Sequence, residues 1–400
     1  MTQKCSAFNT RVLRLRLKDK HASALRAMAA DVNFVWNYCN ELSFKVLERE
    51  RRFISGFDLQ SYLNGASKEG LRVGSAVFQQ VAEEFAQKRK QFRKAKLRWR
   101  VSNRRRANYS LGWIPFKARS LTYRGGQVAF QGLKLSLWDS YGLADYELGA
   151  GNVSEDSRGR WYLNVTVKVK KQAKSTASEP SGEALGIDLG LKAHMTDSEG
   201  VAVEAQQFYR DLEPQLAAAQ RAGKKKRVRA LHAKVSNRRK DFLHKLSTRQ
   251  VRDNAALFVG DVNASALAQT RMAKSVLDAG WSAYRTMLQY KSDDAGVWFK
   301  VVDEKFSTQD CSACGARTGP KGREGLSVRR WVCSCCGLEH DRDTNAARNI
   351  RLKGLAWLES EFAKAAEARA DDAILNESAG LRPPALAPGH GRPDVGIPVL

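Results

Sequence analysis

The sequence predicts a mixed fold, in which an α/β domain follows a β-rich region and a helical region. Three observations lead to this expectation. From Ala184 onward, short apolar strands alternate with helical stretches, whereas residues 109–170 show short alternating segments separated by glycine turns. Residues 18–106 carry long helical patterns, and two CxxC pairs between residues 311 and 336 indicate a small metal-binding module inside the α/β region.

The N-terminal half begins with a predicted strand over residues 9–17 and an amphipathic helix over 21–48. A second helical stretch is expected over about 73–104, and residues 109–170 predict a small β-barrel or sandwich that the first strand completes. A polar linker is expected over 171–183. The apolar residues of the first helix recur at helical spacing, so we expect them in a core: Leu25, Met28, Val32, Val35, Trp36, Cys39, Leu42 and Val46.

The α/β region starts at Ala184 and gives the order strand, two hairpin strands, a long basic helix (about 210–252), strand, helix (about 272–291), strand and a last helix from Thr344. This order, βββαβαβα, is that of the RNase H-like fold. Residues 365–400 are rich in alanine and then in proline, and we expect them to be disordered.

The chain is strongly basic, with 68 Lys and Arg against 42 Asp and Glu and a formal net charge of +26. Such an excess repels itself unless a polyanion relieves it, so nucleic acid is the expected partner and an anionic membrane surface is the competing interpretation. The sequence has neither a run of about 18 apolar residues that could span a bilayer nor the apolar stretch of a signal peptide. We therefore expect no membrane partner and a cytoplasmic, nucleoid-associated protein of a bacterium or archaeon.

Two segments concentrate the positive charge. Residues 88–106 contain eleven Lys or Arg and no acid, with Phe92 and Trp99 interleaved, and residues 221–240 contain ten Lys or Arg. A solvated face usually mixes both signs, so this density favours contact with phosphates. The expected nucleic-acid contacts are Lys88, Arg89, Lys90, Arg93, Lys94, Arg98, Arg100, Arg104, Arg105, Lys224, Lys225, Lys226 and Arg227.

Five of the seven cysteines lie between residues 311 and 336. The pairs Cys311/Cys314 and Cys333/Cys336 are separated by 18 residues, a spacing typical of a closed, structural zinc site with four thiolate ligands. The fifth thiol, Cys335, is expected to be spare.

Two aspartates are candidate ligands for a catalytic metal. Asp188 interrupts the apolar strand LGIDLGLK, where a carboxylate is costly unless it has a partner, and a divalent metal is the usual one. Asp343, in HDRDTNAARNI, begins a helix and could instead act as its cap. Together, Asp188 and Asp343 in the βββαβαβα order of elements predict a site for two Mg²⁺. One ion would activate water, and the other would stabilise the leaving oxygen.

The motifs GIDLG, GDVN, FSTQDCSACG and WVCSCCGLEHDRDTNAARNI, within residues 183–352, resemble the TnpB (OrfB) proteins of insertion sequences. These are transposon-encoded RNA-guided DNA endonucleases related to the type V CRISPR effectors, and GNVSEDSRGRWYLNVTV and DFLHKLS resemble them more loosely. The resemblance implies a guide RNA and a double-stranded DNA target. It assigns Asp188 and Asp343 as catalytic and Cys311, Cys314, Cys333 and Cys336 as zinc ligands.

The resemblance also implies a domain plan. Residues 1–17 and 107–172 would form a wedge-like β-barrel, interrupted by a helical recognition domain over 18–106. Residues 183–305 and 341–364 would form a RuvC-like nuclease domain, interrupted by a zinc-bearing module over 306–340 that binds target nucleic acid.

One departure from the family concerns the catalytic glutamate that usually ends the fourth strand, because Gly260 stands in its place here. Asp261, Asp278 and Glu304 are the candidate substitutes. Asp261 should point to the opposite face of its strand, and Asp278 should orient a helix. Glu304 ends the fifth strand, VWFKVVDE, which lies about 4.8 Å from the fourth in such a sheet. We therefore expect Asp188, Glu304 and Asp343 to be catalytic and to bind magnesium.

Two other functions stay open from the sequence. The protein could be a nuclease-dead, RNA-guided DNA-binding protein, because the expected glutamate is absent at Gly260. It could also be a compact type V CRISPR effector that uses the same chemistry with another source of guide RNA. The sequence leaves the oligomeric state undetermined.

Overall fold

The computed structural model describes residues 8–66, 70–170, 172, 184–322 and 324–380, with the side chains of the last helix described to residue 367. The expected linker lies almost entirely outside the described residues. The chain divides into two compact units. The first comprises 1–173, 206–252 and 264–296, and the second comprises 174–205, 253–263 and 297–400.

The first unit contains the predicted N-terminal strand and amphipathic helix, β1 (Phe8–Arg16) and α1 (Ala22–Glu50). The apolar stripe expected on α1 is confirmed as core, with only Leu42 left partly exposed. Two further helices follow, α2 (Gly56–Ser61) and α3 (Ser75–Phe92). Phe78 and Phe85 of α3 are fully buried in the same core, and Phe85 meets Trp36 edge to face.

Two antiparallel sheets complete the N-terminal half. The larger has the order β1-β7-β6-β2, so the first strand does join the later ones, as predicted. One bridge, between Leu17 and Leu137, links it to the smaller sheet β3-β4-β5. Closure of the two sheets into a barrel stays an expectation. The strands are β2 (Trp113–Phe116), β3 (Thr122–Arg124), β4 (Gln127–Phe130), β5 (Leu133–Ser136), β6 (Leu148–Glu155) and β7 (Trp161–Lys170).

The helix expected over about 73–104 is shorter than predicted. It ends at Phe92, where Arg93 takes a left-handed conformation with φ of 51°. The chain then runs along α1, where asparagine side chains form hydrogen bonds with its backbone N–H and carbonyl groups. Asn40 exchanges two hydrogen bonds with the backbone of Leu97 (2.8 and 2.9 Å), and Asn37 does the same with Arg100 (2.9 and 2.8 Å). These amides replace the hydrogen bonds of a helix, which explains the early end.

Two other predicted helices are broken at glycines with positive φ. The long basic helix is divided at Gly223 (φ 62°) into α4 (Glu213–Arg221) and α5 (Lys225–Asp253). The helix expected over 272–291 is divided at Gly280 (φ 67°) into α7 (Ala273–Ala279) and α8 (Trp281–Ala295), after the short α6 (Ala264–Leu267). Glycine adopts this left-handed conformation without the steric cost of a Cβ, so it ends helices readily.

The second unit is built on a five-stranded mixed sheet of order β10-β9-β8-β11-β12. Strand β9 is antiparallel to β8 and β10, whereas β11 is parallel to both β8 and β12. The predicted order of strands along the chain is therefore confirmed, and the fourth and fifth strands are neighbours as expected. The strands are β8 (Ala184–Leu189), β9 (Ala193–Asp197), β10 (Ala202–Glu204), β11 (Ala256–Gly260) and β12 (Trp298–Val302).

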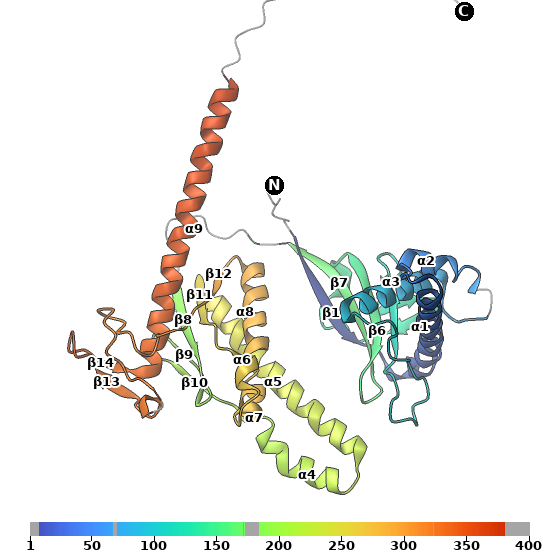
Figure 1. Cartoon of the computed structure of the whole chain (residues 1–400), viewed down its shortest axis with the longest axis horizontal. Helices are drawn as coiled ribbons and strands as arrows, with labels where there is room; N and C mark the ends of the chain where they lie inside the picture. Colours follow the sequence, from blue (N-terminus) through green and yellow to red (C-terminus); the bar gives the residue numbers. More distant parts are fainter. Residues whose placement is uncertain (1–7, 67–69, 171, 173–183, 323, 381–400) are drawn as a thin grey trace, which may run out of the picture. The chain divides into compact units, whose positions relative to one another are not determined.

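Helix α9 (Arg342–Gly380) packs directly on this sheet (Figure 1). Two glycines permit the close approach: a Cβ on Gly186 of β8 would lie 2.1 Å from the carbonyl oxygen of Ala347, and one on Gly354 would lie 2.0 Å from the ring of Phe258. The prediction that disorder starts at residue 365 is wrong as far as Gly380, since the helix continues to that residue. Its alanine-rich sequence has high helix propensity.

A small module leads into α9. It contains the two-stranded sheet β13 (Arg330–Val332) and β14 (Glu339–Asp341), in which Trp331 pairs with His340. Short 3-10 helices occur at Asp19–His21, Leu143–Asp145, Arg210–Leu212 and Glu324–Leu326. Among the described residues, no helix combines the length and apolar character needed to cross a membrane.

Candidate active site and metal centre

Asp188 lies near the carboxyl end of the central strand β8, opposite Thr196 of β9. Asp188 is half-buried, and the residues on either side of it in the strand, Ile187 and Leu189, are buried. The pKa of the Asp188 carboxyl is raised to about 8, first by burial and then by the neighbouring carboxylates Asp343 and Glu304, while Arg342 opposes the shift. Asp188 therefore belongs to a cluster of carboxylates whose negative charges repel one another.

Glu304 occupies the space that the missing side chain of Gly260 leaves beside the sheet. Gly260 ends β11 and pairs with Val302 of β12, two residues before Glu304. A Cβ built on Gly260 would lie 2.8 Å from Oε2 of Glu304 and 3.2 Å from Cδ1 of Ile350. The Glu304 carboxylate thus lies directly against the strand end where a glutamate was expected.

The other two candidate substitutes have structural roles. Asp261 is exposed, and its Oδ1 accepts a hydrogen bond from the backbone N–H of Glu304 at 3.1 Å, so it positions Glu304. Asp278 is buried in the first unit, where it accepts hydrogen bonds from the backbone N–H of Tyr209 (2.9 Å) and from Arg239 (2.7 Å).

Asp343 lies in the first turn of α9 but does not act as its cap. That role belongs to Asp341, whose Oδ1 accepts a hydrogen bond from the backbone N–H of Thr344 at 3.0 Å. Asp343 instead forms an ion pair with Arg329, whose Nη1 lies 3.1 and 3.0 Å from its two carboxylate oxygens. The alternative that Asp343 is simply a cap is therefore disfavoured.

The three carboxylates form a donor set that fits a divalent cation. Carboxylate oxygens are the ligands that magnesium prefers, and a cation would offset the repulsion that helps to raise the pKa of Asp188. Among groups of three or more His, Cys, Asp or Glu residues in the described part of the chain, only the four cysteines have their ligand atoms all within 4.8 Å of one another. The three carboxylates are therefore not yet gathered as closely as metal ligands. The carboxylates would have to draw closer around a metal, and Arg329 would have to release Asp343.

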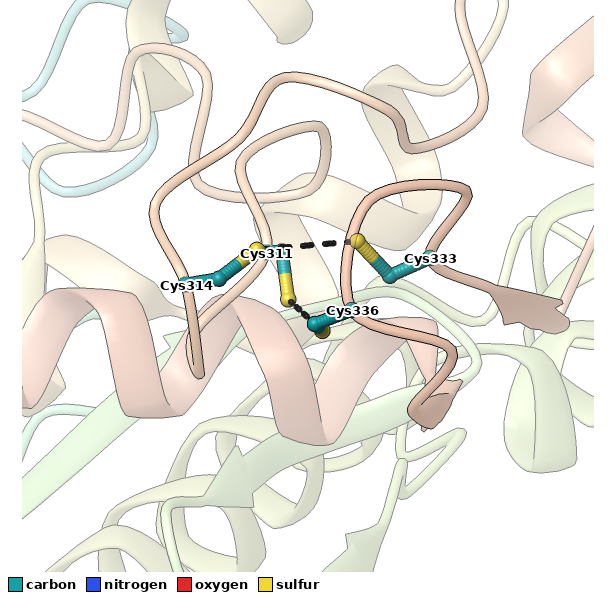
Figure 2. A group of neighbouring side chains, drawn as sticks. All are labelled: Cys311, Cys314, Cys333 and Cys336. Atoms are coloured by element: carbon teal, nitrogen blue, oxygen red, sulfur yellow. Dashed lines mark hydrogen bonds between the residues drawn. The ribbon is translucent and has the colours of Figure 1, made fainter.

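The four predicted zinc ligands meet in one cluster (Figure 2). Sγ of Cys311 lies 3.7 Å from Sγ of Cys336, and Sγ of Cys314 lies 3.7 Å from Sγ of Cys333. Four thiolates at such distances can surround one tetrahedral metal ion, and this donor set suits zinc. Cys335 is exposed and outside the cluster.

Two side chains that the sequence did not single out contact the cysteines. Nε2 of the buried His340 lies 3.0 Å from Sγ of Cys311. The hydroxyl of Thr318 donates to Sγ of Cys333 at 3.2 Å. This bond, together with hydrogen bonds from the backbone of Cys336 and Cys335, lowers the pKa of the Cys333 thiol. No motif points to either residue, because strand pairing and loop closure bring them to the cluster.

The cysteine module is also bonded to α9. Asn345 and Asn349 each donate to the carbonyl oxygens of Ser307 and Asp310, over distances from 2.6 to 3.1 Å. Asn345 accepts a further hydrogen bond from the backbone N–H of Ser312 at 2.9 Å. The first cysteine pair is therefore fixed to the helix turn that follows Asp343.

Most of the expected nucleic-acid contacts are exposed, but one is buried and two are only partly exposed. Arg89 is buried, donates to Ser43 and to the carbonyl oxygen of Ile54, and lies over Phe53, so it serves the core. Arg100 is half-buried and donates to the carbonyl oxygen of Leu111 at 2.9 Å. The exposed members are Lys90, Arg93, Lys94, Arg98, Arg104, Arg105, Lys224, Lys225, Lys226 and Arg227, and Lys88 is half-exposed.

Two known families match parts of the chain. Residues 164–271 match the OrfB_IS605 family, described as a probable transposase. Residues 281–350, which include the cysteine module, match the family described as Cas12f1-like, TNB domain. The resemblance to TnpB proteins is therefore confirmed.

Individual relatives agree with these families. A candidate RNA-guided DNA endonuclease of Streptomyces pristinaespiralis is 37% identical over 218 residues, which cover 51% of this chain and 52% of that protein. The CRISPR-associated endodeoxyribonuclease Cas12f1 of Sulfoacidibacillus thermotolerans is 25% identical over 264 residues, which cover 59% of this chain and 61% of that protein. The chain thus spans between half and three fifths of the length of these relatives.

The fold is also similar to a solved structure. A Cas12f1 chain, determined by cryo-electron microscopy in complex with sgRNA and target DNA, superposes with a TM-score of 0.55 at 12% identity. The superposition covers 86% of this chain and 99% of that chain. At this identity the similarity concerns the fold.

Proposed function

We propose that this chain, whose sequence and fold are similar to those of TnpB and Cas12f1 proteins, is an RNA-guided DNA endonuclease that hydrolyses phosphodiester bonds. The observation that carries the proposal is the position of Glu304. Its carboxylate fills the space beside Gly260 and interacts with Asp188, so the chain retains a third acid at the strand end.

The domain plan of the proposal follows the family. The five-stranded sheet with α9 would be the RuvC-like nuclease core, and residues 306–340 would be a zinc-bearing module that binds target nucleic acid. The two antiparallel sheets would form the wedge-like domain, and α1 to α3 the helical recognition domain.

In this proposal Asp188, Glu304 and Asp343 hold Mg²⁺, while Cys311, Cys314, Cys333 and Cys336 hold Zn²⁺. Bound magnesium would activate the attacking water and stabilise the charge on the leaving 3′ oxygen. The backbone N–H of Glu304 donates to Asp261, which fixes the turn that presents the Glu304 carboxylate. Asn345 and Asn349 fix the start of α9 and thereby the position of Asp343.

The proposed partners are a guide RNA and double-stranded target DNA. The net charge of +26 and the exposed cations of residues 88–106 and 221–240 support them, because phosphate contacts supply most of the affinity for nucleic acid. Base pairing of the guide would select the target sequence, and the protein would recognise a short motif beside it.

The main alternative is a nuclease-dead, RNA-guided DNA-binding protein. Gly260 favours this function, whereas the retention of Asp188 among two other carboxylates opposes it. A compact CRISPR effector would use the same site and differ only in the source of its guide.

The test uses the full chain, purified with the RNA that it retains. That RNA is sequenced, and a plasmid library carrying the complementary target beside a randomised motif is incubated with the complex and Mg²⁺. We expect cleavage by the unmutated complex. Glu304→Gln should lower the cleavage rate by at least about a hundredfold, since even outer partners of a metal site contribute 10–100-fold. It should leave target binding in a gel-shift assay unchanged.

Two matched variants sharpen the result. Asp261→Asn keeps an oxygen that accepts from the N–H of Glu304, so it should retain most of the cleavage. The double variant Gly260→Glu with Glu304→Ala returns a carboxylate to the fourth strand and removes the closest contact at Gly260, with Oε2 of Glu304, so it should recover part of the activity. Full cleavage by Glu304→Gln would refute the relocation, and RNA-guided binding without cleavage by the unmutated complex would favour the nuclease-dead alternative.

A further inference from the structure

The first unit contains a hollow of 410 Å³ between the end of α3 and the extended chain that follows it. Phe92 and Trp99 line it, and they leave 57% and 47% of their surface exposed. A second hollow of 660 Å³ shares Lys88 and Arg98 with the first, so the two adjoin. Large aromatic side chains usually lie in the core, and two of them exposed in one hollow suggest a binding role.

The charged residues of the smaller hollow are all cations. Lys88, Lys94 and Arg98 line it with the two aromatic rings, and no acid does. Aromatic faces bind nucleobases by stacking, and Lys and Arg beside them bind the phosphates that link those bases. This combination of side chains is therefore typical of a site for single-stranded nucleic acid.

The backbone around Trp99 is held in place before any ligand binds. The bonds from Asn40 and Asn37 fix Leu97 and Arg100, on either side of Trp99. Lys96 lies over the Trp99 ring at 5.5 Å and is itself paired with Glu41 at 2.8 Å. A ring that is already oriented loses little conformational entropy when a base stacks on it.

We propose that this hollow binds an unpaired nucleotide, with the base stacked on Trp99 and its phosphates on Lys88 and Arg98. The hollow falls within the range of about 300–1,000 Å³ that is usual for small-molecule sites, and it suits one extruded nucleotide better than a duplex. This inference rests on the proposed function, because it gives the basic segment 88–106 a preference for unpaired strands beyond general attraction to phosphate.

The test measures binding of a fluorescent, unstructured RNA of about 12 nucleotides, a length within the usual site sizes of 4–16. Single-stranded DNA and duplex RNA of the same sequence are compared, on full-length protein stripped of its RNA. Trp99→Ala should weaken binding of single strands about tenfold at every salt concentration. It should leave the slope of log affinity against log salt unchanged, because the number of phosphate contacts stays the same.

Three variants control the result. Trp99→Phe keeps an aromatic face and should retain most of the affinity. Phe57→Ala removes a ring that is 81% exposed on α2 and lines neither hollow, so it should bind normally. Lys88→Ala with Arg98→Ala should reduce the salt slope instead. A loss confined to RNA would assign the nucleotide to RNA, and an equal loss with DNA would assign it to unpaired strands of either kind.

The proposal is overturned if Trp99→Ala binds single strands as the unmutated chain does, or if it weakens duplex binding equally. Failure of the unmutated chain to bind any of these strands would overturn the proposed function as well. These outcomes are distinguishable. If the unmutated chain binds RNA and the Trp99→Ala variant binds it equally well, only the stacking site is contradicted.

Discussion

His340 is almost fully buried, and its ring packs against that of Trp331 with centroids 4.7 Å apart. Its Nε2 lies 3.0 Å from Sγ of Cys311, so a proton on that nitrogen would donate to the thiolate. Partners of this kind orient metal ligands and are worth about 10–100-fold in metal affinity. His340 is therefore a positioning residue for the proposed zinc centre.

We predict that His340→Ala loses zinc about 10–100-fold more readily to a chelator, measured with a colorimetric zinc indicator. His340→Gln can still donate from its amide and should recover part of the difference. His232→Ala, an exposed histidine on α5, is the control and should release zinc at the rate of the unmutated protein. Identical release by His340→Ala would show that the contact with Cys311 does not support the metal.

Residues with a distinctive spacing could be predicted from the sequence, and residues brought together by folding could not. The four cysteines are predictable from their two CxxC pairs, and Asp188 is predictable from its position in an apolar strand. His340 reaches Cys311 only because β14 pairs with β13, and the space beside Gly260 is visible only once β12 lies beside β11. For Glu304 the family pattern supplied the missing information, since the neighbour of the fourth strand could be anticipated.

At the scale of the elements, helix α1 both contributes to the core and holds the extended segment that follows α3 through three asparagine side chains. Asn33, Asn37 and Asn40 lie one and two turns apart on one face of the helix, and each bonds to the extended segment that follows α3. In this ladder of asparagines, Asn37 and Asn40 supply backbone hydrogen bonds that a continued helix would otherwise provide, and Asn33 bonds to the side chain of Ser102. Helical periodicity could not predict it, because alternating cations over 93–104 fit a helix equally well on sequence grounds.

We predict that Asn40→Ala destabilises the protein by about 2 kcal/mol, because it leaves the buried N–H and carbonyl of Leu97 without partners. The change should appear as a lower midpoint of urea unfolding of the first unit and faster hydrogen exchange at the Leu97 amide. Phe34→Ala, on the exposed face of the same helix, should leave both unchanged. Unaltered exchange at Leu97 in Asn40→Ala would contradict the ladder.

Helix ends were less predictable than helices themselves. Gly223 and Gly280 each interrupt a pattern that continues on both sides, and a glycine inside such a pattern only weakens a helix. The left-handed conformation that ends the helix depends on where the next helix packs. The continuation of α9 to Gly380 shows the converse, since an alanine-rich segment without apolar periodicity still forms a helix.

For the whole molecule, the net charge of +26 predicts affinity for any polyanion, and its distribution decides whether that affinity is localised. Lys90, Lys94, Arg98 and Arg105 are exposed within one acid-free segment. If they contact phosphates, each contributes to the counterions released on binding, and the dependence on salt reports their number.

We predict that changing these four residues to Gln lowers the slope of log affinity against log salt by about 3 for single-stranded RNA, at roughly 0.7 for each contact. The control changes four exposed lysines outside the segment, Lys45, Lys134, Lys245 and Lys364, and removes the same net charge. Its slope should fall by much less, because dispersed lysines attract the polyanion only at long range, where salt screens them. An equal fall in both variants would mean that total charge governs binding and that the segment 88–106 is no specific contact surface.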